Sequence, residues 1–262
     1  MTLINATLIA PPLAWWRLPF ALALFGQNRI LHRCQLCQIH PCMAHTSVKM
    51  AKGSHSHWFN RLTYLCDECH HATQWQAANF QLDLSHTAFA TMLTGMACTS
   101  YQLPYAECMR EFKNHSQFHR LGVLVHALRQ LERPPGCHGG NSLIITVPTS
   151  HERLIERGFD PVHWLAQYLS FHWQIPLFMG VKRDARRHQQ GLTREARLDN
   201  MRGAFSIAAL PPTNHLIIFD DVVTTGATLQ SLIDVIPSAI HHRASAHPLP
   251  ILHIRSVLHG YS

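Results

Sequence analysis

The segment 217-IIFDDVVTTGATL-229 joins an apolar run to two adjacent acids and a turn rich in threonine and glycine. Residues 217–219 carry no charge, which favours a strand that is buried on both faces. Apolar residues recur at helical spacing from Leu229 onward, so the polar turn should open a helix. We therefore expect Asp220 and Asp221 at the carboxyl end of a strand, the edge where open α/β sheets bind ligands.

The turn after these acids has the chemistry of an anion-binding site. The N-terminus of a helix offers free N–H groups and the positive end of a dipole. Gly226 lets the backbone approach a ligand closely, and the hydroxyls of Thr224, Thr225 and Thr228 add hydrogen-bond donors. A ribose 5-phosphate would place its phosphate on the turn and its vicinal hydroxyls on the acids. The alternative is a turn whose threonines only cap the helix, although paired acids at a buried strand end are costly without partners.

This pattern resembles the phosphoribosyl pyrophosphate (PRPP) loop of type I phosphoribosyltransferases. The resemblance implies that Asp220 and Asp221 hold the ribose hydroxyls. The residues that would hold the 5-phosphate are Thr224, Thr225, Gly226, Ala227 and Thr228.

The composition suits one large domain, or one domain with a small module. The chain has 262 residues, of which 47% are hydrophobic, which is ample for a packed core. Its formal charge of +7 favours phosphate or polyanion partners, although charge alone does not exclude a merely basic protein. With 22 histidines in the chain, a single histidine is a poor metal-ligand candidate.

Residues 1–26 are strongly apolar, but they fit neither a secretory signal nor a membrane span. No Lys or Arg precedes the apolar stretch, and Pro11, Pro12, Arg17 and Pro19 interrupt it. We expect a helix at 13–25 that packs on the body of the protein, with a peripheral membrane contact as the alternative. These features favour a cytoplasmic protein without stable membrane insertion, whose eight cysteines would not form a disulfide framework.

Four cysteines form two closely spaced pairs, 34-CQLC-37 and 66-CDEC-69. Each such pair can direct two thiolates at one centre, so Cys34, Cys37, Cys66 and Cys69 are the predicted ligands of a structural zinc ion. The intervening 28 residues are long for a compact ribbon. Other residues in that insert that could substitute for a ligand are Cys42, His45, His55 and His57.

Two other interpretations of the cysteine pairs remain open. The run 66-CDECH-70 matches the c-type haem attachment pattern, but haem attachment would require export and leaves the first pair unexplained. A redox pair is the second alternative. The cysteines without metal-ligand spacing, which we expect to be buried or incidental thiols, are Cys98, Cys108 and Cys137.

The rest of the chain alternates helical and strand patterns, which indicates a mostly parallel sheet. Apolar spacing predicts helices at 86–101 and 105–132, and Asp160 followed by Pro161 should begin another. The expected strands are 143–148, 177–181, 215–221 and 249–258.

Two basic stretches could face a pyrophosphate. Arg153 and Arg157 follow the first of these strands and could bind it bidentately, although solvated arginines on an amphipathic turn are the alternative. Residues 182–203 contain seven Lys/Arg against three Asp/Glu. That segment favours a mobile basic loop, with a solvated charged helix at 193–202 as the alternative.

Taken together, the order of these motifs resembles the ComF family, which includes GntX-like proteins, over roughly residues 30–258. Beyond the cysteine pairs and the 220–228 loop, the matching residues are Lys113; Pro148, Ser150, Arg153, Arg157, Gly158 and Phe159; and Arg183, Gln190, Leu192, Arg194, Arg197 and Asn200. Two departures are the long gap between the cysteine pairs and the missing glycine after Lys113.

The resemblance implies an α/β fold with a zinc-ribbon-like module before a phosphoribosyltransferase-type domain. We expect a packing segment at 1–30, the module at 31–85 and the larger domain at 86–262, with a helical lead-in at 86–140. The cofactors would be structural Zn²⁺, and Mg²⁺ with PRPP. The groups that would neutralise the pyrophosphate during catalysis are Arg153, Arg157, Arg183 and Arg194.

The family's role implies DNA uptake, natural transformation or the use of external DNA. Contacts with single-stranded DNA and the DNA-uptake machinery would follow, and the basic segments fit a nucleic acid electrostatically. Aromatic residues near the cysteines could stack on bases or form the core of the module: Trp58, Phe59, Tyr64 and Trp75. Two other functions remain open: a metabolic phosphoribosyltransferase, and a non-enzymatic zinc-ribbon DNA-binding adaptor.

Overall fold

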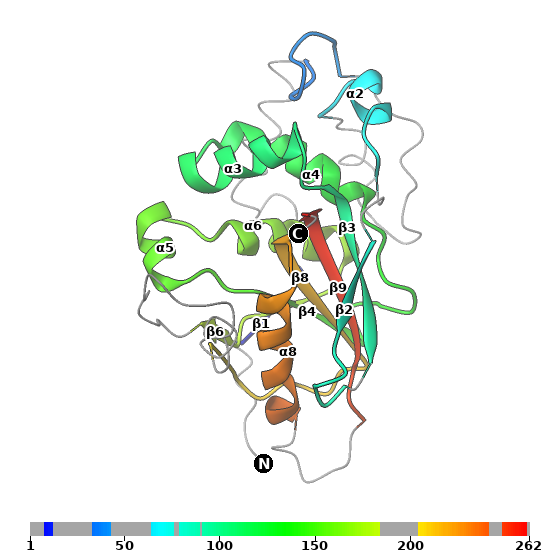
Figure 1. The fold of residues 1–262 in the computed structure, drawn as a ribbon, viewed down its shortest axis with the longest axis vertical. Helices are drawn as coiled ribbons and strands as arrows, with labels where there is room; N and C mark the ends of the chain where they lie inside the picture. The colour runs from blue at the N-terminus through cyan, green and yellow to red at the C-terminus, as the bar shows by residue number, and fades with distance from the viewer. Residues whose placement is uncertain are drawn as a thin grey trace.

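The computed structural model describes residues 8–12, 33–42, 64–75, 79–89, 91–183, 204–240 and 248–260. Within these residues the chain forms an α/β fold around a sheet of seven strands (Figure 1). In spatial order the strands are β1 (Ile9–Ala10), β5 (Leu177–Phe178), β4 (Ser142–Thr146), β8 (His215–Val223), β9 (Ile251–His259), β3 (Met92–Ser100) and β2 (Asn79–Asp83). The strands from β5 to β3 run parallel, whereas β1 and β2 are antiparallel edges. The predicted class and the mostly parallel sheet are therefore confirmed.

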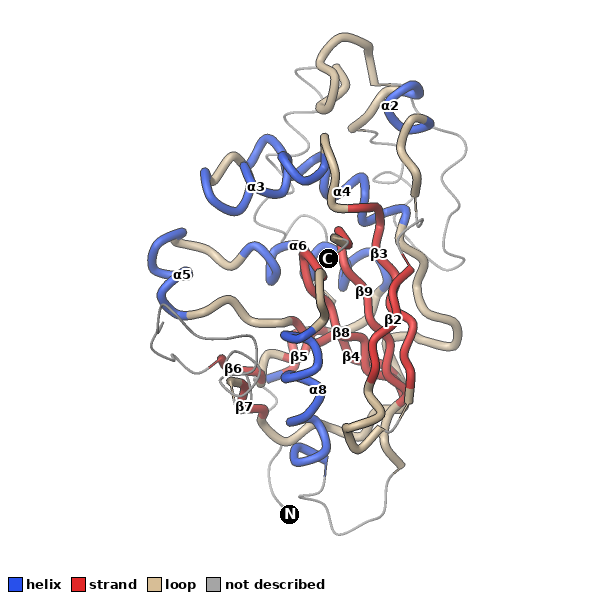
Figure 2. The backbone as a smooth tube through the Cα atoms, viewed as in Figure 1, coloured by secondary structure: helices blue, strands red, loops and turns tan. Residues whose placement is uncertain are grey.

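Helices cover both faces of this sheet. The helices α4 (Leu121–Gln130) and α6 (Pro161–Trp173) lie on one face, and α8 (Ala227–Ile240) lies on the other. The remaining described helices are α2 (Asp67–His71), α3 (Tyr105–His115), the short 3-10 turn η4 (Phe118–Arg120) and α5 (His151–Arg157). A small antiparallel pair, β6 (Val181–Arg183) and β7 (Phe205–Ile207), lies beside the main sheet. Figure 2 shows α8 along the near face of the sheet, with α3 and α4 crossing beyond its upper end.

Strand β8 explains how the apolar run at 217–219 is used. Ile217 and Phe219 pack in the core shared with α4 and α6, whereas Leu216 and Ile218 pack in the core that contains α8. Successive side chains of a strand point to opposite faces, so an uninterrupted apolar run suits a strand covered on both sides.

Two expectations about the elements need correction. The helix expected at 86–101 is wrong, because Met92–Ser100 forms β3, which pairs with both β2 and β9. The helix expected at 105–132 is present, but it is divided into α3, η4 and α4. The strands expected at 143–148, 215–221 and 249–258 and the helix that begins after Asp160 occur where the sequence predicts them. The strand expected at 177–181 is shorter, because only Leu177–Phe178 joins the main sheet as β5 and Val181 begins β6 of the small pair.

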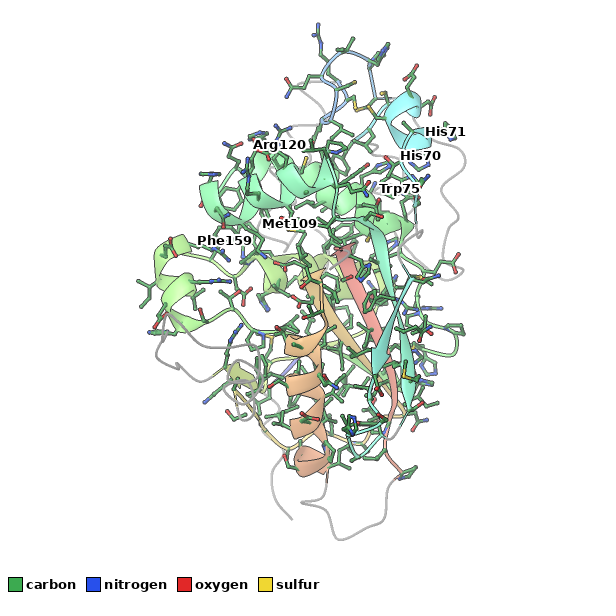
Figure 3. The ribbon with its side chains drawn as sticks, viewed as in Figure 1. His70, His71, Trp75, Met109, Arg120 and Phe159 are labelled. Carbon is green, nitrogen blue, oxygen red and sulfur yellow. The ribbon has the colours of Figure 1, made fainter. Side chains whose placement is uncertain are left out.

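The cysteine-containing segments pack on α3 and α4. Cys34, Tyr64 and Cys66 are at most 1% exposed and belong to the same core as Phe112 of α3 and Leu124 of α4. Figure 3 shows the side chains of His70 and Trp75 at the junction between the cysteine segment and these helices. Tyr64 is buried and Trp75 is partly buried against this core, so the described aromatic residues near the cysteines contribute to the core of the segment.

Several expectations fall outside the described residues. These are the helix at 13–25, the helix at 193–202 and most of the basic segment 182–203, with Arg194, His45, His55, His57, Trp58 and Phe59. Among the described helices, none combines the length and apolar character that a membrane crossing requires.

Candidate functional site

A pocket opens at the carboxyl ends of two neighbouring parallel strands, β4 and β8. After β4 the chain passes through α5 and α6 to β5 on one side, and after β8 it passes through α8 to β9 on the other side. Such a divergence of connections leaves a crevice between the strand ends, where open α/β sheets bind ligands. The pocket has a volume of about 170 Å³. Its polar and charged lining residues are Lys113, Thr149, Ser150, Arg153, Arg157, Arg183, Asp220, Asp221 and Thr228.

The two acids lie inside the last part of β8, because the strand continues to Val223. Asp220 and Asp221 are 8% and 4% exposed, so both carboxyl groups are buried. The Asp220 side chain accepts a hydrogen bond from the backbone N–H of Asp221 at 2.8 Å. Burial, reinforced by the neighbouring charge of Asp221, raises the pKa of Asp220 well above its ordinary value.

Lys113 of α3 is the cationic partner of the acid pair. Its Nζ lies 2.8 Å from Oδ2 of Asp221, and the two side chains are 22% and 6% exposed. The following residue, Asn114, accepts a hydrogen bond at 3.0 Å from the guanidinium of Arg157. The C-terminal turn of α3 therefore holds both an acid of β8 and an arginine of α5.

Three arginines supply further positive charge to the pocket. Arg153 and Arg157 belong to α5, and Arg183 ends β6 with its guanidinium over the ring of Phe205 at 5.5 Å. Burial lowers the pKa of Arg183, and the nearby Arg153 contributes to the same shift. With Lys113, four cationic side chains face two carboxyl groups, so the pocket favours an anionic ligand.

The turn between β8 and α8 has the geometry expected of a backbone anion site. Thr224 and Thr225 are exposed, and Gly226 has a φ of +74°, in the region that favours glycine. A Cβ at Gly226 would lie 2.4 Å from Cδ1 of Leu82, so close packing also requires glycine there. Helix α8 begins at Ala227, with Thr228 on the pocket wall. Its first N–H groups therefore lie beside the pocket, where they suit a phosphate.

The opposite wall is fixed by the turn between α5 and α6. Asp160 caps α6 by accepting from the N–H groups of Val162 and His163, and it also accepts from the hydroxyl of Thr149 at 3.0 Å. Phe159 packs between Phe112 and Trp164, with ring centroids 5.4 and 5.5 Å away. Phe159 and Gly158 thus have structural roles, since Gly158 ends α5 with a φ of +74°.

The structure brings some of the residues that the sequence nominated into one pocket, whereas Thr224, Thr225, Gly226 and Ala227 are not among its lining residues. Arg153, Arg157 and Arg183 share the pocket with the acid pair and Thr228. Arg194 lies outside the described residues. The sequence did not nominate three polar residues that line the pocket, Lys113, Thr149 and Ser150, although Lys113 and Ser150 belong to the family pattern. It also missed Asn114, which bonds to Arg157 and has no motif of its own.

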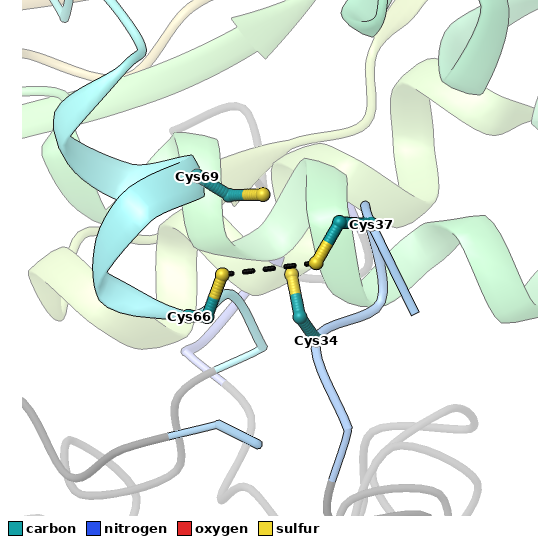
Figure 4. A group of neighbouring side chains, drawn as sticks. All are labelled: Cys34, Cys37, Cys66 and Cys69. Carbon is teal, nitrogen blue, oxygen red and sulfur yellow. Dashed lines mark hydrogen bonds between the residues drawn. The ribbon is translucent and has the colours of Figure 1, made fainter. Parts of the chain in front are cut away.

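The four predicted cysteine ligands converge on one centre (Figure 4). Cys34 and Cys37 lie on a turn between Arg33 and Pro41, which pair in an isolated bridge. Cys66 precedes α2, and Cys69 lies in its first turn. Their sulfur atoms lie within 4.8 Å of one another, with Cys37 and Cys66 at 3.8 Å. Tetrahedral zinc with bonds of about 2.3 Å separates sulfur ligands by roughly 3.8 Å, so the cluster fits a zinc ion. Cys42 lies outside this four-thiol group.

One thiol of this cluster is prepared for ionisation. Burial acts to raise the pKa of Cys37, but hydrogen bonds to its sulfur from the backbone at His40 and Ile39 and from the thiols of Cys34 and Cys69 together outweigh burial, and the pKa falls to about 6. The thiolate is the form that binds a metal, so these backbone contacts favour metal binding. Of the four cysteines outside the pairs, Cys98, Cys108 and Cys137 are buried as expected, whereas Cys42 is partly exposed.

No family model matches the chain, but curated proteins resemble part of it. Competence protein F of Haemophilus influenzae is 34% identical over 94 residues, which cover 34% of this chain and 41% of that protein. DNA utilization protein YhgH of Shigella flexneri is 33% identical over 95 residues, or 36% of this chain and 42% of the relative, and the Escherichia coli K12 protein of the same name is 32% identical over 95 residues. The match thus spans about two fifths of the length of these relatives. These similarities agree with the resemblance to the ComF family that the motifs indicate.

Proposed function

We propose that the pocket between β4 and β8 binds PRPP or a related phosphoribosyl ligand together with Mg²⁺. The observation that carries this proposal is the meeting of three features in one pocket: a buried acid pair, four cationic side chains and the N-terminus of α8. Each feature complements one part of the ligand. The acid pair suits the ribose hydroxyls, the cationic side chains suit the pyrophosphate, and the N-terminus of α8 suits the 5-phosphate.

The residues of the pocket divide between the two ends of such a ligand. Asp220 and Asp221 would accept hydrogen bonds from the ribose hydroxyls, and the turn at 224–228 would bind the 5-phosphate through backbone N–H groups and hydroxyls. Arg153, Arg157 and Arg183 would stabilise the negative charge that develops on a departing pyrophosphate. Mg²⁺ held with the ligand would neutralise part of the same charge. If the site is catalytic, the reaction is displacement of pyrophosphate from C1 of the ribose by a nucleophile.

Ligand-induced thermal shifts test this proposal. Mg²⁺–PRPP at about 100 times its Kd should stabilise the protein by roughly 2.7 kcal/mol, which corresponds to a rise of several degrees. The rise should disappear in the Asp220→Asn/Asp221→Asn double variant and persist in Asp234→Asn, a substitution at an exposed position of the same helix α8. Parallel titrations with ribose 5-phosphate and with inorganic pyrophosphate separate the two ends of the site. No shift in the wild-type protein with any of the three would contradict the proposal.

The relatives favour a role in DNA uptake or in the use of external DNA. Their names, competence protein F and DNA utilization protein, connect them with DNA, and the formal charge of +7 suits a polyanionic partner. We propose that this chain serves the same kind of process and contacts single-stranded DNA through its basic segments. A metabolic phosphoribosyltransferase and a DNA-binding adaptor without catalysis are the two competing outcomes.

Two measurements distinguish these outcomes. Binding to a fluorescent single-stranded oligonucleotide should weaken steeply as salt rises, because phosphate contacts release counterions. The gene should also restore transformation to a Haemophilus influenzae strain that lacks competence protein F, and the Asp220→Asn/Asp221→Asn variant should not restore it. Rescue by the double variant would favour the adaptor. Pyrophosphate release that depends on an added base, without oligonucleotide binding, would favour the metabolic enzyme.

A further inference from the structure

A second group of metal-ligand side chains lies at the opposite end of the sheet from the pocket. It consists of Cys137, His215 and His253, and one ligand atom from each lies within 4.8 Å of the others. His215 is the first residue of β8, whereas the acid pair lies five positions further along the same strand. At about 3.3 Å per residue, roughly 17 Å separates the two groups. The group is therefore independent of the phosphoribosyl pocket.

The two histidines come from adjacent parallel strands. Ile217 of β8 pairs with His253 of β9, so His215 and His253 are diagonal neighbours on one face of the sheet. Nδ1 of His215 lies 3.1 Å from Nε2 of His253. Two imidazole nitrogens on a tetrahedral ion with bonds of about 2.0 Å would lie roughly 3.3 Å apart. The observed separation therefore needs little change to accommodate a metal.

The loop that carries the cysteine is fastened to the same strand. The carbonyl of Asn141 accepts hydrogen bonds from the backbone N–H groups of Asn214 and His215, at 3.0 and 3.1 Å, and from the hydroxyl of Thr213 at 2.8 Å. Cys137 is 2% exposed, and its own N–H bonds to the carbonyl of Pro134. These contacts hold the thiol against the histidine pair without help from a ligand, which is the arrangement of a preorganised site.

From this geometry we propose that Cys137, His215 and His253 form a second zinc site, distinct from the four-cysteine cluster. One thiolate and two imidazoles are borderline-soft ligands, which suit Zn²⁺ better than Mg²⁺ or Ca²⁺. Three protein ligands leave the fourth position to water or to an external ligand, and both histidines are only half-buried, so the ion can enter from solvent. The ion would join β8, β9 and the 136–142 loop. Spacing along the chain does not reveal such a site, because its residues come from three distant segments.

Zinc stoichiometry measured by native mass spectrometry tests the proposal. Full-length protein, reduced and freed of metal, is reloaded with Zn²⁺ and separated from excess ion. Cys137→Ala and His253→Gln should each hold one zinc fewer than the wild type. Cys98→Ala removes a buried thiol outside the group and His86→Gln removes an exposed histidine, so both should retain the wild-type number. Counting differences between variants removes any contribution from other sites.

A second readout guards against loss of folding. In the Cys34→Ser/Cys37→Ser background, Co²⁺ should produce thiolate-to-cobalt absorption that disappears when Cys137→Ala is added and remains with Cys98→Ala. In the same background, saturating Zn²⁺ should raise the melting temperature by roughly 5–10 °C, and His253→Gln should abolish the rise. Unchanged zinc counts in both Cys137→Ala and His253→Gln would overturn the proposal and leave a hydrogen-bonded histidine pair.

Discussion

Asp220 is the side chain whose burial is hardest to explain without a ligand. A carboxyl group that is 8% exposed beside a second acid resists ionisation, and its pKa is raised for that reason. In the free protein the folded state therefore retains a proton that the unfolded chain releases near pH 4. Such a group favours folding at low pH and opposes it as pH rises toward the folded pKa. A site that holds Asp220 ready for the ribose hydroxyls of the proposed ligand would carry this cost.

Replacement of Asp220 by Asn should therefore stabilise the free protein at high pH. Asparagine keeps the oxygen that accepts from the N–H of Asp221, but it has no proton to lose. We expect the unfolding free energy of Asp220→Asn to exceed that of the wild type by about 1 kcal/mol or more at pH 8, and the difference to shrink toward pH 4. Urea unfolding at four pH values measures it. Parallel curves for the two proteins at all pH values would show that Asp220 ionises normally.

The contact between Lys113 and Asp221 should behave as a coupled pair. Lys113→Met leaves a buried carboxylate without its cation, and Asp221→Asn leaves the ammonium without its acceptor, so each should lower stability by about 1–3 kcal/mol. The double variant should lose less than the sum of the two, because neither group is then left alone. Thermal or urea unfolding of the wild type, the two single variants and the double variant completes this double-mutant cycle. Additive losses would mean that the two side chains do not interact in solution.

The cap of α6 connects a helix end with a wall of the pocket. One oxygen of Asp160 accepts from Val162, His163 and the hydroxyl of Thr149, which lines the pocket. Asp160→Ala should cost about 0.5–2 kcal/mol of stability. It should also weaken phosphoribosyl binding, because Thr149 loses its anchor. Asp160→Asn, which keeps the acceptor oxygen, is the matched control, and an equal loss of affinity in both variants would point to charge instead of the cap.

The sequence predicts best the elements whose hydrophobic pattern or capping residues follow directly from their local structure. Residues 217–219 form an uninterrupted apolar run, which suits a strand buried on both faces, and Asp160–Pro161 is a local signal for the start of α6. The prediction of a helix over 92–100 is wrong because the apolar residues of this segment fit the spacing of a helix as well as that of a strand. Its strand conformation depends on pairing with β2 and β9. Pairing with β9 also extends β8 beyond the acids, since Val223 pairs with His259. Neither of these strand pairings can be recognised from the local sequence.

The candidate site likewise divides into residues that the local sequence reveals and residues that only the fold brings together. The acids and the threonine–glycine turn are contiguous, so their chemistry is visible in one segment. Lys113 reaches them from a helix that precedes the central strands, and His215 meets Cys137 and His253 only after the sheet has formed. Contacts of this kind depend on tertiary packing and have no periodic signature.

The described parts of the cysteine segment and the pocket domain share one core. Arg129 of α4 is buried with its guanidinium over the ring of Tyr64 at 5.2 Å and hydrogen bonded to the hydroxyl of Tyr168 at 2.6 Å. Tyr64 precedes Cys66 by two residues, and Tyr168 lies in α6. One side of α4 thus contacts the cysteine cluster while the other supports the sheet. The metal should consequently influence the pocket through α3 and α4.

Removal of zinc should therefore weaken phosphoribosyl binding as well as unfold the cysteine segment. Loss of the ion frees Cys34 and Cys66 from the core that positions α3, and α3 carries Lys113 to the acid pair. Because α8 packs in the core on the other face of the sheet, the 224–228 turn should keep its structure. After chelation, hydrogen exchange should rise in 64–75 and 105–115 and stay constant in 227–240, while affinity for Mg²⁺–PRPP, measured after the chelator is removed, falls several-fold. A rise confined to 64–75 with unchanged affinity would show instead that the cysteine segment folds as a separate module and that α3 is held by α4 alone.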